Sequence, residues 1–122
     1  MEGGRAIVRI PMAGTFAWRT YGVHWIQLDA PRHIHIPTEN GMRVLTDRAN
    51  LQIMQSFYDS WSFQFWGSEQ YKQDIPLNDP RTPIFSHERI DEWERQAVRL
   101  NEHRDGDHAT FILEEDSHQK PL

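Results

Sequence analysis

The fold class is decided by SHERIDEWERQAVRL at residues 86–100 and ATFIL at residues 109–113. In the first stretch, Ser86 is a suitable N-cap and acidic residues occupy the early turns, where the helix dipole favours anions. An apolar stripe then recurs with helical spacing at Ile90, Trp93, Ala97 and Leu100. The second stretch is short and rich in β-branched and aromatic residues, as strands are. The sequence therefore predicts a helix that is followed by a strand.

The first half of the chain indicates further strands. Residues 6–10 are β-branched and end at Pro11, and residues 16–28 combine aromatic and β-branched side chains. Asn40-Gly41 follows an alternating stretch and is typical of a two-residue turn, so we expect a β-hairpin over residues 33–46. Pro37 cannot donate to a ladder, which favours an edge position for this hairpin. The predicted class is α+β, with an antiparallel sheet of N-terminal strands and the hairpin packed against two helices.

The middle of the chain fits two patterns. Leu51, Met54 and Tyr58 follow helical spacing, whereas residues 61–66 alternate as a strand does. We therefore expect a helix over residues 47–59 that leads into a strand over residues 61–66. The connection that follows, residues 67–85, carries three prolines, and connections of this length often contact a partner.

The bulk composition is that of a globular protein. A chain of 122 residues has room for a single domain, residues 1–122, with one core. The absence of cysteine excludes disulfides and thiolate metal sites and fits a cytoplasmic location. The sequence shows neither a signal-peptide pattern nor an apolar run near the ~20 residues of a membrane span, so we expect no membrane association.

Charge is unevenly distributed along the chain. The net charge is −5, with six arginines against four acidic residues in residues 1–50, and seven basic against fourteen acidic residues in the remainder. A general nucleic-acid-binding protein carries a concentrated basic surface, so this distribution argues against that class. An acidic surface could instead face a basic partner or simply keep the protein in solution.

One histidine pattern could hold a metal ion. His33 and His35 would project from the same face of a strand, and Glu39 could complete a site for a divalent cation, with His24 as a further ligand. The spacing over residues 33–39 resembles the first metal motif of cupins, which reads His-x-His, three or four residues, then Glu. The rest of the chain departs from that family, because the expected glycines and a second histidine motif are absent. The alternative is that these histidines face solvent while the isoleucines between them face the core.

Aromatic residues and arginine are the second candidate set. Trp, Tyr and Arg dominate the energetics of protein interfaces, and an exposed aromatic ring beside an arginine could also bind a nucleotide. Most of the aromatic side chains are expected in the core. The candidates for binding a ligand or a partner are Trp18, Arg19, Tyr21, Trp25, Arg32, Phe65 and Trp66.

The sequence shows no nucleophile motif, no P-loop and no dinucleotide-binding turn. The leading hypothesis is a small, acidic, non-enzymatic binding or inhibitor protein that occupies the surface of a partner protein, and that could form a homodimer. In character it is similar to phage-encoded inhibitors of host defence. The alternatives are a protein that sequesters a nucleotide or small metabolite, and a small metal-dependent enzyme that uses the His-x-His site. No cofactor is expected except the divalent metal of that last alternative.

Overall fold

The computed structural model describes residues 3–29 and 32–116 of the chain. Its elements are, in chain order, β1 (Arg5–Pro11), α1 (Phe16–Tyr21), two 3₁₀ turns (Gly22–His24 and Ile26–Leu28), α2 (Glu39–Arg48), β2 (Leu51–Tyr58), α3 (Phe63–Lys72), α4 (His87–Glu102) and β3 (His108–Glu115). This confirms the α+β class and the antiparallel sheet. Among these residues, no helix combines the length and apolar character that crossing a membrane requires.

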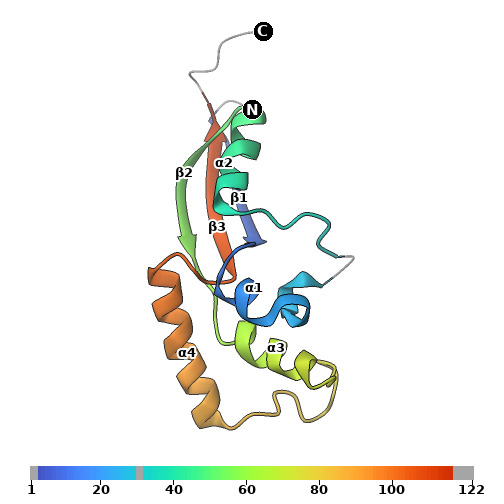
Figure 1. Ribbon diagram of the computed structural model, residues 1–122. Coiled ribbons are helices and arrows are strands. Elements are labelled where there is room, and N and C mark those ends of the chain that lie inside the picture. The colour runs from blue at the N-terminus through green and yellow to red at the C-terminus, as the bar shows by residue number, and fades with distance from the viewer. Residues whose placement is uncertain (1–2, 30–31, 117–122) are drawn as a thin grey trace.

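The sheet has three antiparallel strands in the order β1-β3-β2, so the last strand of the chain lies in the middle. Helix α2 packs across one face of the sheet, as Figure 1 shows. Side chains alternate between the two faces of a strand, and those that point toward α2 form a core. This core contains Met12, Met42, Tyr58, Ala109, Phe111 and Leu113.

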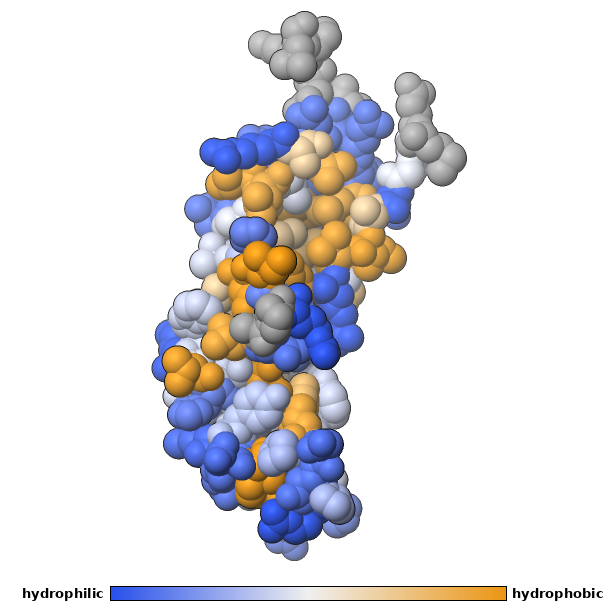
Figure 2. Space-filling model, turned by 90° about the vertical axis from the view of Figure 1, so that its right-hand side faces the viewer, coloured by the Kyte–Doolittle hydropathy of each residue, from blue (hydrophilic) through white to orange (hydrophobic). Residues whose placement is uncertain are grey.

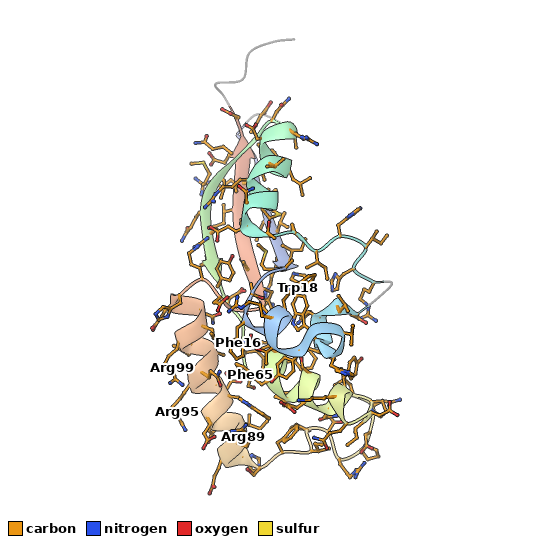
Figure 3. The ribbon with its side chains drawn as sticks, viewed as in Figure 1. Phe16, Trp18, Phe65, Arg89, Arg95 and Arg99 are labelled. Carbon is orange, nitrogen blue, oxygen red and sulfur yellow. The ribbon has the colours of Figure 1, made fainter. Side chains whose placement is uncertain are left out.

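A second core lies below the sheet in Figure 1, where α1, α3 and α4 come together. Phe65 of α3 stacks on Trp93 of α4 with ring centroids 6.0 Å apart, and Phe16 of α1 meets the edge of Phe65. Phe16 and Phe65 are labelled in Figure 3, in the space that these three helices enclose. The remaining buried members are Ala17, Tyr21, Trp25, Ile26 and Ala97.

The stretch that decided the fold class has the predicted structure. The Ser86 hydroxyl accepts a hydrogen bond from the backbone N–H of Arg89 at 3.1 Å, which makes it the N-cap of α4. Trp93 and Ala97 are the buried residues of that helix. The strands predicted at residues 6–10 and 109–113 are β1 and β3, each slightly longer than expected.

The hairpin predicted over residues 33–46 is wrong. Asn40-Gly41 lies in the first turn of α2, because the Thr38 hydroxyl accepts a hydrogen bond from the Gly41 N–H at 3.0 Å and so caps a helix. Glu39 and Arg43 form an i,i+4 pair at 2.9 Å that belongs to the same helix. Pro37 therefore precedes a helix, and the expected edge hairpin is replaced by α2 on the sheet.

Three other predicted elements are wrong for a related reason, since short apolar runs fit both periods. Residues 16–28 form α1 and two 3₁₀ turns rather than a strand. Residues 51–58, within the predicted helix 47–59, form β2, and the predicted strand 61–66 lies largely in α3. The described chain thus has four α-helices where two were expected, and its long connection begins only after α3.

Candidate functional site

The sheet face opposite α2 is the first candidate surface, and we call it the open face. The strand register places its side chains in three rows: Arg9, Thr110 and Phe57; then Ile7, Ile112 and Gln55; then Arg5, Glu114 and Gln52. Two of its apolar side chains are notably exposed, Ile7 at 73% and Phe57 at 41%. In the described part of the chain, α2 is the helix that packs across the sheet, and it does so on the other side.

The open face has an apolar centre and a polar rim. Ile7 and Ile112 are direct partners across β1 and β3, and Phe57 lies one row away on β2. Around them lie the two arginines of β1, the two glutamines of β2 and Glu114. Figure 2 shows the side that lies to the right in Figure 1, where apolar side chains also gather over the half that holds the sheet and α2. Surface patches of this composition are typical of protein interfaces.

A network of charged and polar side chains occupies the end of the open face nearest α3. Asp59 accepts a hydrogen bond from the Thr110 hydroxyl at 2.9 Å and lies 2.8 Å from Nδ1 of His108. Arg9 pairs with the same carboxylate at 3.2 Å and approaches Nε2 of His108 at 3.4 Å. Asp59 thus orients the imidazole and balances the charge of Arg9.

A pocket of about 340 Å³ adjoins this network, and we call it the Trp61 pocket. Trp61, a residue that is 47% exposed, forms one wall, and its ring stacks on Phe63 with centroids 5.5 Å apart. The polar side chains that line it are Arg9, Gln27, His33 and His108. None of the described residues that line it is acidic, although the protein as a whole carries a net charge of −5.

The four predicted metal ligands are not on one strand. Residues 33–38 form an irregular segment, and Glu39 is the first residue of α2. His33 lines the Trp61 pocket, His35 is exposed, and His24 lines a separate pocket with Tyr71. Within residues 3–29 and 32–116, no three histidine, aspartate or glutamate side chains lie close enough to hold a metal ion. The strand geometry on which the metal hypothesis depended is therefore wrong.

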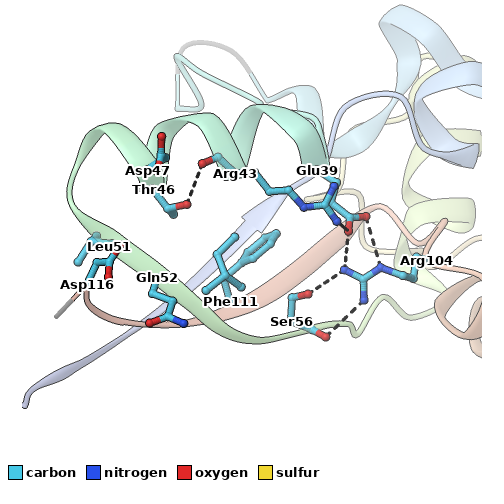
Figure 4. Close-up of a pocket in the computed structure, with 11 residues that line it drawn as sticks. Glu39, Arg43, Thr46, Asp47, Leu51, Gln52, Ser56, Arg104, Phe111 and Asp116 are labelled. Atoms are coloured by element: carbon cyan, nitrogen blue, oxygen red, sulfur yellow. Dashed lines mark hydrogen bonds and ion pairs between the residues drawn. The ribbon is translucent and has the colours of Figure 1, made fainter. Parts of the chain in front are cut away.

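Glu39 instead belongs to a structural network that joins α2, β2 and the end of α4. Figure 4 shows the guanidinium of Arg104 between Glu39 and Ser56, with hydrogen bonds of 2.9 Å and 2.7 Å. The Tyr58 hydroxyl donates to Glu39 at 3.1 Å, and Arg104 lies over the Tyr58 ring. These residues lie beside a pocket of about 560 Å³ whose lining also includes Asp47 and Asp116.

The Glu39 network makes stability depend on pH. The hydrogen bond from Arg104 holds the pKa of Glu39 below its ordinary value, while burial raises the pKa of Tyr58 to about 12. A carboxylate with a lowered pKa stabilises the folded state above its unfolded pKa, and the contribution is lost as pH falls through the folded value. We expect Glu39→Gln to lower the free energy of unfolding by about 1 kcal/mol at neutral pH. Urea titrations should show this difference shrinking in acid, and a difference independent of pH would contradict the assignment.

The predicted aromatic residues lie mostly in the core. Tyr21, Trp25 and Phe65 are buried. Trp18 is 42% exposed and meets the edge of Trp25, with centroids 5.9 Å apart. Trp66 contacts the edges of Trp61 and Phe63, so it supports the wall of the Trp61 pocket from behind.

The two predicted arginines each pair with a carboxylate. Arg19 binds Asp105 through two hydrogen bonds of 3.0 Å and 2.7 Å and also donates to the Gly14 carbonyl. Arg32 pairs with Asp29 at 3.3 Å and is otherwise exposed. The structure therefore does not gather the predicted aromatic and arginine residues into one site.

The open face and the Trp61 pocket were not among the predicted sites. Their residues come from β1, β2 and β3 and from the start of α3, and the strand pairing is what unites them. One signal was available, since Ile7 and Arg9 alternate with the more buried residues of the first predicted strand. No protein-family model, curated protein or solved structure matches the chain.

Proposed function

We propose that the protein is a non-enzymatic binding protein that acts by occupying the surface of a partner protein, with the open face as its docking surface. The observation that carries this proposal is the apolar centre of the open face, Ile7, Ile112 and Phe57, left without a covering helix in the described part of the chain. A one-sided sheet ordinarily turns a polar face to water. The exposure of Ile7 and Phe57 beside the half-buried Ile112 costs free energy that a docked partner would recover.

The rim of the open face favours a protein partner over a nucleic acid. Arg5 pairs with Glu114 at 2.6 Å, and Arg9 pairs with Asp59 at 3.2 Å. Binding a nucleic-acid backbone needs a row of uncompensated cations, whereas each of these guanidinium groups has a carboxylate beside it. The partner that fits best carries an apolar ridge, bordered by carbonyl groups that accept hydrogen bonds from the arginine and glutamine side chains.

Inhibition is the simplest consequence of such docking. A small protein that covers a functional surface blocks it without needing catalytic groups of its own, as phage-encoded inhibitors of host defence do. The buried area of a stable complex is about 800 Å² on each partner, which is more than three apolar side chains supply. We therefore expect the contact to extend over the rim and onto the exposed ring of Trp61.

Site-specific photo-crosslinking tests the docking surface. A photoreactive phenylalanine analogue in place of Phe57, introduced in the organism that encodes the protein, is expected to give one discrete covalent adduct with a second protein. The same analogue in place of Val98, which is 55% exposed on α4, serves as the matched control and should give none. Adding Ile7→Asp to the Phe57 probe should lower the adduct yield about tenfold or more, since a charge would enter the apolar centre.

The mass of the adduct distinguishes the kinds of partner. An adduct of twice the mass of the chain would show self-association through the open face and would contradict a foreign partner. Equal yields from positions 57 and 98, or a yield unaffected by Ile7→Asp, would contradict docking at this face. Val98→Asp, combined with the Phe57 probe, controls for the introduced charge.

A further inference from the structure

The Trp61 pocket adjoins the open face, and Arg9 belongs to both. We propose that the pocket binds a small ligand in which a flat heteroaromatic ring is joined to a phosphate, the chemistry of a nucleoside monophosphate. Its volume of about 340 Å³ lies at the lower end of the range for small-molecule sites. The aromatic wall of the pocket accounts for the ring, and its polar lining accounts for the phosphate.

The aromatic wall is built to receive a planar ring. Phe63, which also lines the pocket, stacks on Trp61 at an interplanar angle of 26°, and the ring of Trp66 meets that of Trp61 at 81°. Phe63 in turn meets the edge of Trp66, with centroids 4.7 Å apart, so the three rings brace one another. The indole is therefore fixed in orientation while half of its surface stays exposed. A rigid, half-exposed indole is the arrangement on which nucleobases stack.

The polar lining suits an anion. Arg9 and His33 line the pocket, and no described residue of the lining carries a negative charge. The Asp59 carboxylate contacts Arg9, His108 and Thr110 but is not part of the pocket lining. It therefore balances the charge of Arg9 from outside the pocket. The larger pocket beside Glu39 differs, because its lining holds three acidic residues, Glu39, Asp47 and Asp116, together with Arg43 and Arg104. In the Trp61 pocket the carboxylate that pairs with Arg9 lies outside the lining, so a single phosphate can share the guanidinium of Arg9 with Asp59.

Gln27 and His108 can contact other parts of the ligand. Gln27 offers both a donor and an acceptor to the edge of a base. His108 has its Nδ1 against Asp59 and its Nε2 toward Arg9, so its ring orientation is set before any ligand arrives. Preorganisation of this kind lowers the entropic cost of binding.

Isothermal titration calorimetry of the purified full chain tests the site. The probes are AMP, GMP, CMP and UMP, with adenosine and inorganic phosphate titrated separately. We expect at least one of the four nucleotides to bind, and adenosine and phosphate each to bind about tenfold more weakly or not at all, because each supplies half of the contacts. Absence of binding by all four nucleotides at millimolar concentration would overturn the proposal. That result, together with a photo-crosslink from position 61 to the partner protein, would assign the pocket to a partner side chain instead.

Substitutions test whether the nucleotide binds in the Trp61 pocket. Trp61→Leu and Arg9→Gln are each expected to weaken the nucleotide about tenfold, from the lost stacking and the lost charge-assisted hydrogen bonds respectively. Tyr71→Leu and Arg95→Gln, at exposed positions on α3 and α4, are the matched controls and should bind as the unaltered protein does. Both site variants change exposed side chains, so circular dichroism should show them folded. Unchanged affinity in both would overturn the assignment to this pocket.

Discussion

Trp25→Ala is expected to lower the free energy of unfolding by about 4 kcal/mol, one of the two largest effects that we predict for a single substitution. Trp25 is 1% exposed and belongs to the core formed by α1, α3 and α4. Its ring also meets the edge of Trp18, with centroids 5.9 Å apart. Removing the indole would leave a cavity that the neighbouring helices cannot fill by small movements.

Trp25 also donates a hydrogen bond to a buried carboxylate, and the contribution of this bond to stability can be measured separately from that of packing. Its Nε1–H donates to Asp107 at 3.1 Å, and Asp107 is 1% exposed. Burial raises the pKa of Asp107, and the hydrogen bond from Trp25 opposes that rise. Trp25→Phe keeps most of the apolar volume but removes the donor, so we expect a smaller loss of about 2 kcal/mol at neutral pH.

The pH dependence of Trp25→Phe follows from the charge of Asp107. Without the donor the pKa of Asp107 should rise further, so the folded variant binds a proton more readily than the unaltered protein does. The stability lost through the substitution should therefore be largest at neutral pH and shrink as pH falls and Asp107 is protonated in both proteins. Urea unfolding at several pH values measures this, with Trp18→Ala as the control at a half-exposed ring. A loss that grows in acid would contradict the role given to Asp107.

The sequence predicts α4 correctly because all of its signals are local. Ser86, the acidic first turns and the stripe through Trp93 and Ala97 lie within 16 residues and agree with one another. Residues 33–46 fail because two local signals compete there. Asn40-Gly41 indicates a hairpin turn, whereas Thr38 can cap a helix. The helix is favoured because α2 buries Met42 in the core between itself and the sheet, a contact that no local pattern reveals.

The candidate sites could not be predicted from local patterns either, because their residues lie far apart in the sequence. Asp59 and His108 are 49 residues apart in the chain, and Arg9 is 99 residues from His108. They meet because β3 inserts between β1 and β2, which fixes the register of all three strands. His33 was predicted from the sequence as a functional residue, but as a metal ligand on a strand. The structure places it beside His108 and Trp61 instead.

The second large effect is expected at Gly106, where alanine should lower the free energy of unfolding by about 3 kcal/mol. The side chain of Asn101 donates to the carbonyl of Ser60 at 2.8 Å and accepts from its N–H at 3.0 Å, which ties α4 to the segment between β2 and α3. Gly106 packs against both residues. A Cβ at position 106 would lie 2.5 Å from the Ser60 hydroxyl and would clash with the amide oxygen of Asn101.

A double-mutant cycle shows whether this clash acts through the amide of Asn101. In the unaltered protein, Asn101→Ala should cost about 2 kcal/mol, because the N–H and C=O of Ser60 lose their partners. In the Gly106→Ala background the same change should cost much less, since the clash has already displaced the amide and its removal makes room for the new methyl group. Gly22→Ala, where φ is +54° but the surroundings of a Cβ are open, is the control for conformational strain alone and should cost about 1 kcal/mol or more. Strictly additive losses at positions 101 and 106 would instead place the effect of Gly106→Ala at the Ser60 hydroxyl or in the backbone of the turn before β3.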